Sequence, residues 1–343
     1  MAETASARMI AEIGQAPEAV RHQERDLAGP LGELVLRLKA KPPHVVVTVA
    51  RGSSAHAAAF AKHLIERYVG IPVAPAAPSI TTVYHRDLKL KDQLLLAISQ
   101  SGESDDLIEQ TQSARRAGAL SVALVNATGS PLAQASDIVL PLSAGVERSV
   151  AATKTFATTL AALLRLTAAW SEDDFLARAV ARLPERLAAA TALDWSAWTG
   201  TLARASNLIA IGRGPTLGIV REAALKLKET CNLHAEGFSG AEFLHGPIAL
   251  VVRDYPILMF MPGDAAADAL LVLAADLRRK QAALFTVEPG TGEGRLPVVP
   301  PEQSEADAIC AIQSFYAALP QLAKLRGIDA DKPRHLQKVT RTR

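Results

Sequence analysis

The feature that most constrains the fold is a series of short, mostly apolar runs, each followed by a turn and a segment with helical spacing. In the first half of the chain these runs lie at 45–50, 71–74, 94–98, 121–125 and 137–140. Strands that are buried on both faces of a parallel sheet read as continuous apolar runs, and helices usually connect such strands. The pattern therefore predicts an α/β fold with a doubly wound parallel sheet.

The second half of the chain repeats this pattern. An apolar run at 208–212 leads into Arg213-Gly214, as the run at 45–50 leads into Arg51-Gly52, and further strands are expected at 257–261, 283–286 and 296–299. We expect an N-terminal helical segment (1–40) broken near Pro17 and Pro30, a first domain (41–170), a helical linker (171–200), a second domain (201–326) and a C-terminal tail (327–343).

Composition excludes several classes of function. The chain has 343 residues, a net charge of +2 and only 4% aromatic residues, so no basic or stacking surface for nucleic acid is expected. No apolar run is long enough to span a bilayer, and no signal peptide is expected at the start. Two distant cysteines, Cys231 and Cys310, argue against a disulfide framework and fit the cytoplasm.

The segment Ser99–Asp105, called here the serine turn, carries the clearest chemical signal. It contains three serines, a glutamine and a glycine between a buried strand and a predicted helix. Main-chain N–H groups at a helix start have no helical partner, and the helix dipole is positive there, so the turn suits a phosphate group. The alternative is ordinary helix capping, which explains one serine but not the whole group. The second half has Met261-Pro262-Gly263-Asp264 at this place, so we expect one phosphate site only.

Acid–base candidates cluster in the second half. Glu222, Lys226 and Glu229 share one face of a predicted helix, a spacing that is also typical of a solvated Glu–Lys pair. His234 and Glu236 follow, and His245 precedes Gly-Pro in an expected turn, where a histidine either serves acid–base chemistry or is structural. The spacing of these residues supports no metal site.

Several motifs together resemble the sugar-isomerase (SIS) superfamily: SQSGES at 99–104, VAATK at 150–154, ALKLKE at 224–229, HAE at 234–236, HGP at 245–247 and the tail DKPRHLQK at 331–338. Within it, the chain is similar to the isomerase half of glucosamine-6-phosphate synthase and to SIS-type glucosamine-6-phosphate deaminases. The resemblance implies two tandem SIS domains, each a flavodoxin-like α/β/α sandwich, without the glutaminase half that draws ammonia from glutamine.

The resemblance also implies roles for individual residues. Glu229 would move a proton between C1 and C2 of the sugar, Lys226 would hold the sugar and tune Glu229, His245 of the other subunit of a homodimer would assist ring opening, and Lys338 matches a lysine that forms a Schiff base in the synthase. The implied ligands of the phosphosugar are Ser53, Ser54, Ser99, Gln100, Ser101, Ser104, Val150 and Ala152, the last of which is a serine in the synthase motif.

The function implied is that of a glucosamine-6-phosphate deaminase, which needs no metal or other cofactor. Alternatives on the same fold are a galactosamine-6-phosphate deaminase, a fructosamine-6-phosphate deglycase and a simple aldose–ketose isomerase. A phosphosugar sensor without turnover is the alternative of another class, although no effector domain is visible in the sequence. The C4 configuration of the sugar stays open.

Overall fold

The computed structural model describes residues 6–338 and divides into two compact units. The first unit comprises residues 18–147, 154–181 and 337–338, and the second comprises 6–17, 148–153 and 182–336. The outermost residues of the predicted N-terminal segment and tail, 1–5 and 339–343, lie outside the described residues. No helix of the described part is long and apolar enough to cross a membrane.

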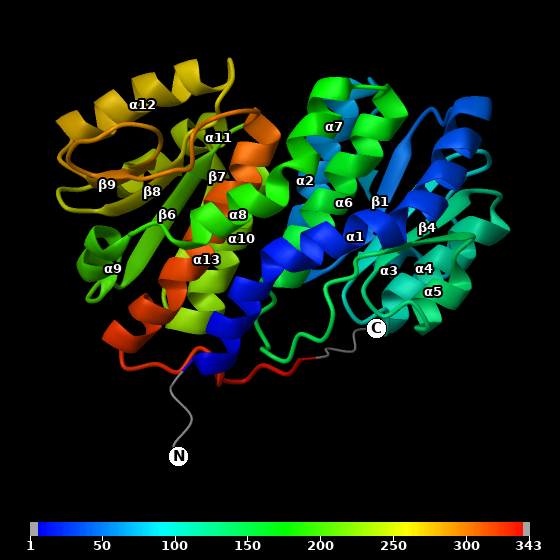
Figure 1. Cartoon of the computed structure of the whole chain (residues 1–343), viewed down its shortest axis with the longest axis horizontal. Helices are drawn as coiled ribbons and strands as arrows, with labels where there is room; N and C mark the ends of the chain where they lie inside the picture. Colours follow the sequence, from blue (N-terminus) through cyan, green and yellow to red (C-terminus); the bar gives the residue numbers. More distant parts are fainter. Residues whose placement is uncertain (1–5, 339–343) are drawn as a thin grey trace. The chain divides into compact units, whose positions relative to one another are not determined.

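The first unit is built on a five-stranded sheet in the order β2-β1-β3-β4-β5. Figure 1 labels β1 and β4 of this sheet. All pairings are parallel, with Val46 of β1 opposite both Val73 and Leu94. This confirms the predicted parallel sheet. The strands are β1 (Val46–Ala50), β2 (Val73–Pro75), β3 (Leu94–Ser99), β4 (Leu120–Val125) and β5 (Ile138–Pro141).

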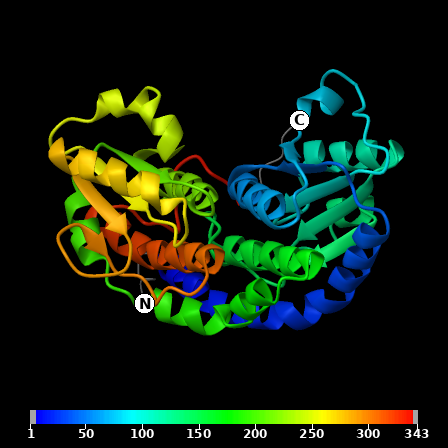
Figure 2. The same ribbon diagram turned by 90° about the horizontal axis from the view of Figure 1, so that it is seen from above.

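Helices cover both faces of this sheet (Figure 2). Helices α4 (Asp105–Arg116) and α5 (Pro131–Ala135) bury Leu107, Ala114 and Leu132 against β1, β3 and β4. Helix α2 (Gly52–Tyr68) contacts β1 and β3 and packs on α6 (Lys154–Ser171). The short α3 (Ser79–Thr82) lies on α4, and α7 (Asp174–Ala181) packs on α6.

The second unit repeats the topology, with a parallel sheet in the order β10-β9-β8-β6-β7. Its strands are β6 (Asn207–Gly212), β7 (His234–Ser239), β8 (Pro256–Phe260), β9 (Ala283–Val287) and β10 (Arg295–Leu296). Strand β6 corresponds to β1 and β8 to β3, so the predicted repeat is confirmed. The sequence did not predict β7, because this edge strand buries Ala235 but exposes His234 and Glu236.

Long helices support one face of this sheet, where α10 (Thr216–Cys231) contacts β6 and β7 and packs on α13 (Ser304–Leu325). Helices α8 (Leu183–Thr191) and α9 (Ser196–Leu202) pack on α13 in turn. Helices α11 (Gly240–Leu244) and α12 (Ala267–Arg279) bury Phe243, Leu270 and Leu273 on the other face, and a 3-10 turn, η1 (Pro247–Leu250), follows α11.

The first helix corrects one expectation. Helix α1 (Ala7–Ala40) runs unbroken through Pro17 and Pro30, whereas the sequence predicted shorter helices. A proline inside a helix costs about 3 kcal/mol. Each large apolar side chain that is fully buried returns about 1.5–3 kcal/mol, and α1 buries six of them at helical spacing: Met9, Ile13, Val20, Leu27, Leu34 and Leu38. The packed face therefore outweighs the two prolines.

Candidate active site

The serine turn connects β3 to α4 at the carboxyl edge of the first sheet. Ser99 ends β3, and its Oγ accepts a hydrogen bond from the Gly102 N–H at 3.1 Å. Gly102 has φ = +67°, and a Cβ there would lie 2.0 Å from Ser130 Oγ, so only glycine fits. Ser104 occupies the N-cap position of α4, but its side chain makes no capping hydrogen bond. Helix capping therefore does not explain the Ser104 hydroxyl.

The turn after β1 lies beside the serine turn, because β1 and β3 are neighbours in the sheet. Arg51 bridges the two turns through Nε and a terminal nitrogen, which lie 2.9 and 2.7 Å from Asp106 Oδ2. Ser53 and Ser54 stand half-buried in the first turn of α2, whose N–H groups have no helical partners. Two helix N-termini thus meet at one sheet edge, an arrangement that attracts an anion.

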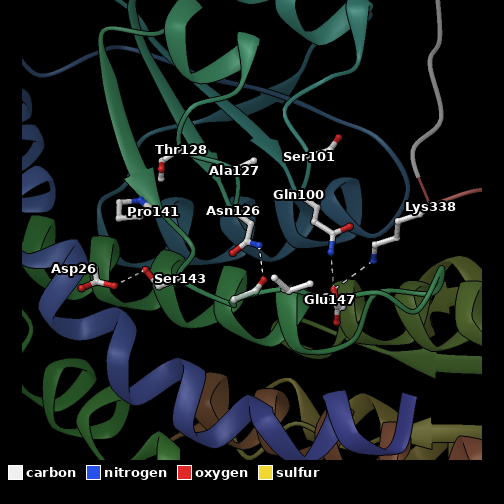
Figure 3. Close-up of a pocket in the computed structure, with 12 residues that line it drawn as sticks. Asp26, Gln100, Ser101, Asn126, Ala127, Thr128, Pro141, Ser143, Glu147 and Lys338 are labelled. Carbon is white, nitrogen blue, oxygen red and sulfur yellow. Dashed lines mark hydrogen bonds and ion pairs between the residues drawn. The ribbon is translucent and has the colours of Figure 1, made fainter. Parts of the chain in front are cut away.

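A cavity of about 640 Å³ lies next to the serine turn within the first unit (Figure 3). Gln100 and Ser101 line it, together with Glu147 and the tail residue Lys338. Lys338 Nζ lies 3.8 Å from Glu147 Oε2, so the structure brings the predicted tail lysine to the predicted phosphosugar ligands. Ser99 is buried and, like Ser53, Ser54 and Ser104, does not line this cavity.

Two further predicted ligands belong to the other unit. Val150 and Ala152 are half-buried in the segment 148–153, which is held to the start of α1 by the Glu12 carboxylate. That carboxylate accepts hydrogen bonds from the main-chain N–H groups of Arg148 and Ser149. The role of Val150 and Ala152 as ligands stays a prediction.

The acid–base candidates on α10 form a buried chain of charges in the second unit. Lys226 is 1% exposed, and its Nζ pairs with Glu229 Oε2 and lies 3.4 Å from Glu222 Oε1. Tyr316 of α13 donates its hydroxyl proton to Glu222 at 3.0 Å. Burial opposes the charge on Lys226, but the two carboxylates outweigh it and raise the pKa of Lys226 above its ordinary value.

The two carboxylates differ in access to solvent. The side chain of Glu222 is 0% exposed, whereas that of Glu229 is 20% exposed. Glu229 can therefore reach a ligand, and Glu222 serves as an inner counter-ion. The face is packed rather than solvated, because α13 covers it.

His245 follows α11 and is exposed, and its main-chain N–H bonds to the Glu242 carbonyl at 3.0 Å. Exposed apolar side chains, Leu244, Leu250 and Val252, flank it in sequence. Nothing within the described chain fixes its imidazole near Glu229, so its contribution to a second subunit stays a prediction.

Sequence reasoning missed Glu147 and Tyr316. Glu147 lies three residues before Val150, the first residue of the VAATK motif, and that position was the only signal in the sequence. Tyr316 gave no signal, since its partner Glu222 lies on another helix. Among residues 6–338, no group of three or more potential metal-ligating side chains comes together.

The second unit has a different pocket at the position equivalent to the serine turn. Thr216, Met261 and Val287 line a cavity of about 210 Å³ whose other lining side chains are mostly apolar, with the carboxylates of Glu288 and Asp307. Carboxylates and apolar groups do not favour a phosphate. The expectation of one phosphate site stays a prediction.

Comparisons with known proteins agree with this architecture. The chain is 32% identical to the glutamine–fructose-6-phosphate aminotransferase (isomerizing) of Pseudomonas syringae pv. tomato, over 96% of this chain and 58% of that protein. It thus spans little more than half the length of that relative. A candidate phosphosugar isomerase from Silicibacter pomeroyi DSS-3 has a similar structure, with a TM-score of 0.90, 42% identity and coverage of 94% of this chain and 99% of the other.

A more distant structural relative shares the fold. Glucosamine-6-phosphate deaminase from Thermotoga maritima superposes with a TM-score of 0.71 at 22% identity, over 96% of this chain and all (100%) of the other. The SIS domain family profile matches residues 41–169 and 201–287, one stretch for each of the two sheets. This match covers more than half of the sequence. The chain therefore belongs to the SIS domain family.

Proposed function

We propose that this protein is a glucosamine-6-phosphate deaminase, which converts glucosamine 6-phosphate and water into fructose 6-phosphate and ammonia. The observation that carries the proposal is the Lys226–Glu229 pair, a carboxylate open to a ligand with a buried ammonium behind it. A carboxylate that can reach a ligand can act as a general base. The relatives at about 32% identity are named for an isomerizing reaction on fructose 6-phosphate, which supports a phosphosugar substrate.

The proposed chemistry moves a proton from C2 to C1, exchanges protons at O1 and nitrogen, and releases ammonia. Glu229 removes the proton from C2 of the open-chain sugar while O1 takes up a proton, which gives an enolamine. Glu229 then delivers its proton to C1 as the amino nitrogen gives one up. The product carries a C=N bond at C2. Water adds to this carbon, and the C–N bond then breaks, leaving the C2 ketone of fructose 6-phosphate and ammonia.

The other residues have supporting roles in the proposal. Lys226 holds the Glu229 carboxylate in place, and Lys338 contacts the open-chain sugar. His245 of a second copy of the chain assists ring opening. The serine turn, with Ser53 and Ser54, binds the phosphate through hydroxyl and main-chain N–H groups.

Enzymatic assays of ammonia release with a panel of sugar phosphates test the proposal. We expect ammonia and fructose 6-phosphate in equal amounts from glucosamine 6-phosphate, and none from unphosphorylated glucosamine. Ser101→Ala should raise KM and change kcat little. Ammonia from galactosamine 6-phosphate or a fructosamine 6-phosphate alone would reassign the substrate, and tight binding without turnover would indicate a sensor.

A further inference from the structure

The buried carboxylate of Glu147 is the centre of a hydrogen-bond network on the cavity wall. Its Oε2 accepts hydrogen bonds from Gln100 Nε2 and Thr155 Oγ1, both at 2.7 Å, and its Oε1 accepts the Lys154 N–H at 2.9 Å. The side chain of Glu147 is 0% exposed. Lys338 Nζ approaches the same Oε2 from the tail (Figure 3).

This network fixes which end of the Gln100 amide faces the cavity. Both carboxyl oxygens of Glu147 act as acceptors in this network, so the donor end of the Gln100 amide, its nitrogen, faces Glu147. The same nitrogen lies 3.1 Å from Thr155 Oγ1, whose own proton is directed to Glu147. The amide nitrogen of Gln100 is thus held toward Glu147. Figure 3 shows the Oε1 of Gln100 turned away from Glu147.

A carbonyl oxygen is a poor ligand for a phosphate. The oxygens of a phosphate dianion are acceptors, and they repel another acceptor at hydrogen-bond distance. Hydroxyl and ammonium groups of a sugar are donors and match Oε1. We infer that Glu147 is a positioning residue that orients Gln100 to recognise a donor group of the sugar, rather than the phosphate. The inference rests on the proposed function in taking a phosphosugar as the ligand, and it revises the role first expected for the Gln100 side chain.

Calorimetric binding of two probes, glucosamine 6-phosphate and inorganic phosphate, to proteins that also carry Glu229→Gln to prevent turnover tests the inference. Gln100→Met keeps the length of the side chain but removes the amide. We expect it to weaken glucosamine 6-phosphate binding about tenfold, with inorganic phosphate binding unchanged within twofold. Glu147→Gln should show the same pattern, because a neutral amide at 147 no longer dictates the orientation of Gln100. Ser101→Ala serves as the control and should weaken both probes.

A third variant, Lys338→Met, separates the effect of the tail ammonium from that of the Gln100 amide. An equal loss in Lys338→Met and in Glu147→Gln, with full affinity in Gln100→Met, would place the effect on Lys338 and overturn the inference. Gln100 is half-buried in a turn, so Gln100→Met decides the question even where Glu147→Gln is unstable. Equal loss of both probes in Gln100→Met would place the amide on the phosphate and would also overturn the inference.

Ammonia release is measured separately on the proteins with Glu229 intact. The expected binding pattern across the variants, together with no ammonia release by the wild type, would contradict the deaminase proposal and leave this inference standing. Ammonia release together with equal losses for both probes would do the reverse. A wild type that binds neither probe would overturn both.

Discussion

Replacing Lys226 by methionine is expected to destabilise the second unit by about 3–5 kcal/mol, the typical cost of removing one partner from a buried ion pair. Lys226 is 1% exposed and Glu222 is 0% exposed, so the substitution removes a cation that contacts a carboxylate shielded from water. The Tyr316 hydroxyl still donates to Glu222 and offsets part of the cost. Glu229 is 20% exposed and can be hydrated, so it adds less.

Urea unfolding at pH 7 checks this value. Fluorescence of Trp195 and Trp198 reports on the second unit, and a Trp170→Phe background removes the tryptophan of the first unit. The double variant Lys226→Met/Glu222→Gln removes the buried carboxylate charge at position 222 together with its Lys226 contact, so it should recover more than half of the loss. A single variant that loses less than about 1 kcal/mol, or a double variant no more stable than the single, would refute the buried-pair argument.

Three further predictions concern stability. The raised pKa of Lys226 means that the stabilisation by Lys226 is present below the unfolded pKa of 10.5 and is lost as the pH rises through the folded pKa. As the pH rises, the difference in unfolding free energy between wild type and Lys226→Met should therefore shrink only above about pH 10.5. A difference that shrinks as the pH rises through neutrality would contradict this. Gly102→Ala should cost about 1–3 kcal/mol, because the new Cβ would lie 2.0 Å from Ser130 Oγ; an unchanged melting temperature would be inconsistent with the turn described. Asp331→Ala should cost about 1 kcal/mol, since its carboxylate accepts two N–H groups at the start of α1; thermal unfolding measures this loss, and a melting temperature equal to that of wild type would count against it.

Much of the fold was predictable because parallel strands buried on both faces read as continuous apolar runs. Strand β7 was not, since it lies at the sheet edge and exposes His234 and Glu236. The predicted breaks in helix α1 at Pro17 and Pro30 were wrong, because local helix propensity carries no information about the apolar face of α1 that is buried in the folded chain.

The site was predictable where its residues adjoin in sequence. The serine turn and the spacing of Lys226 and Glu229 are local patterns that can be read from the sequence, and the roles of these residues stay predictions. The burial of Lys226 and the contact of Glu147 with Gln100 depend on segments far apart in the chain. No local pattern predicts such contacts, and the amide orientation of Gln100 follows from them alone.

The most direct test of the central claim is the turnover of glucosamine 6-phosphate by Glu229→Gln. Loss of a general base costs about 10²–10⁴-fold, so kcat for ammonia release should fall by at least about 100-fold, while inorganic phosphate binding stays unchanged. Lys228→Gln alters an exposed neighbour on the same helix and should retain wild-type kcat. Wild-type ammonia release by Glu229→Gln would contradict the assignment of Glu229 as the base.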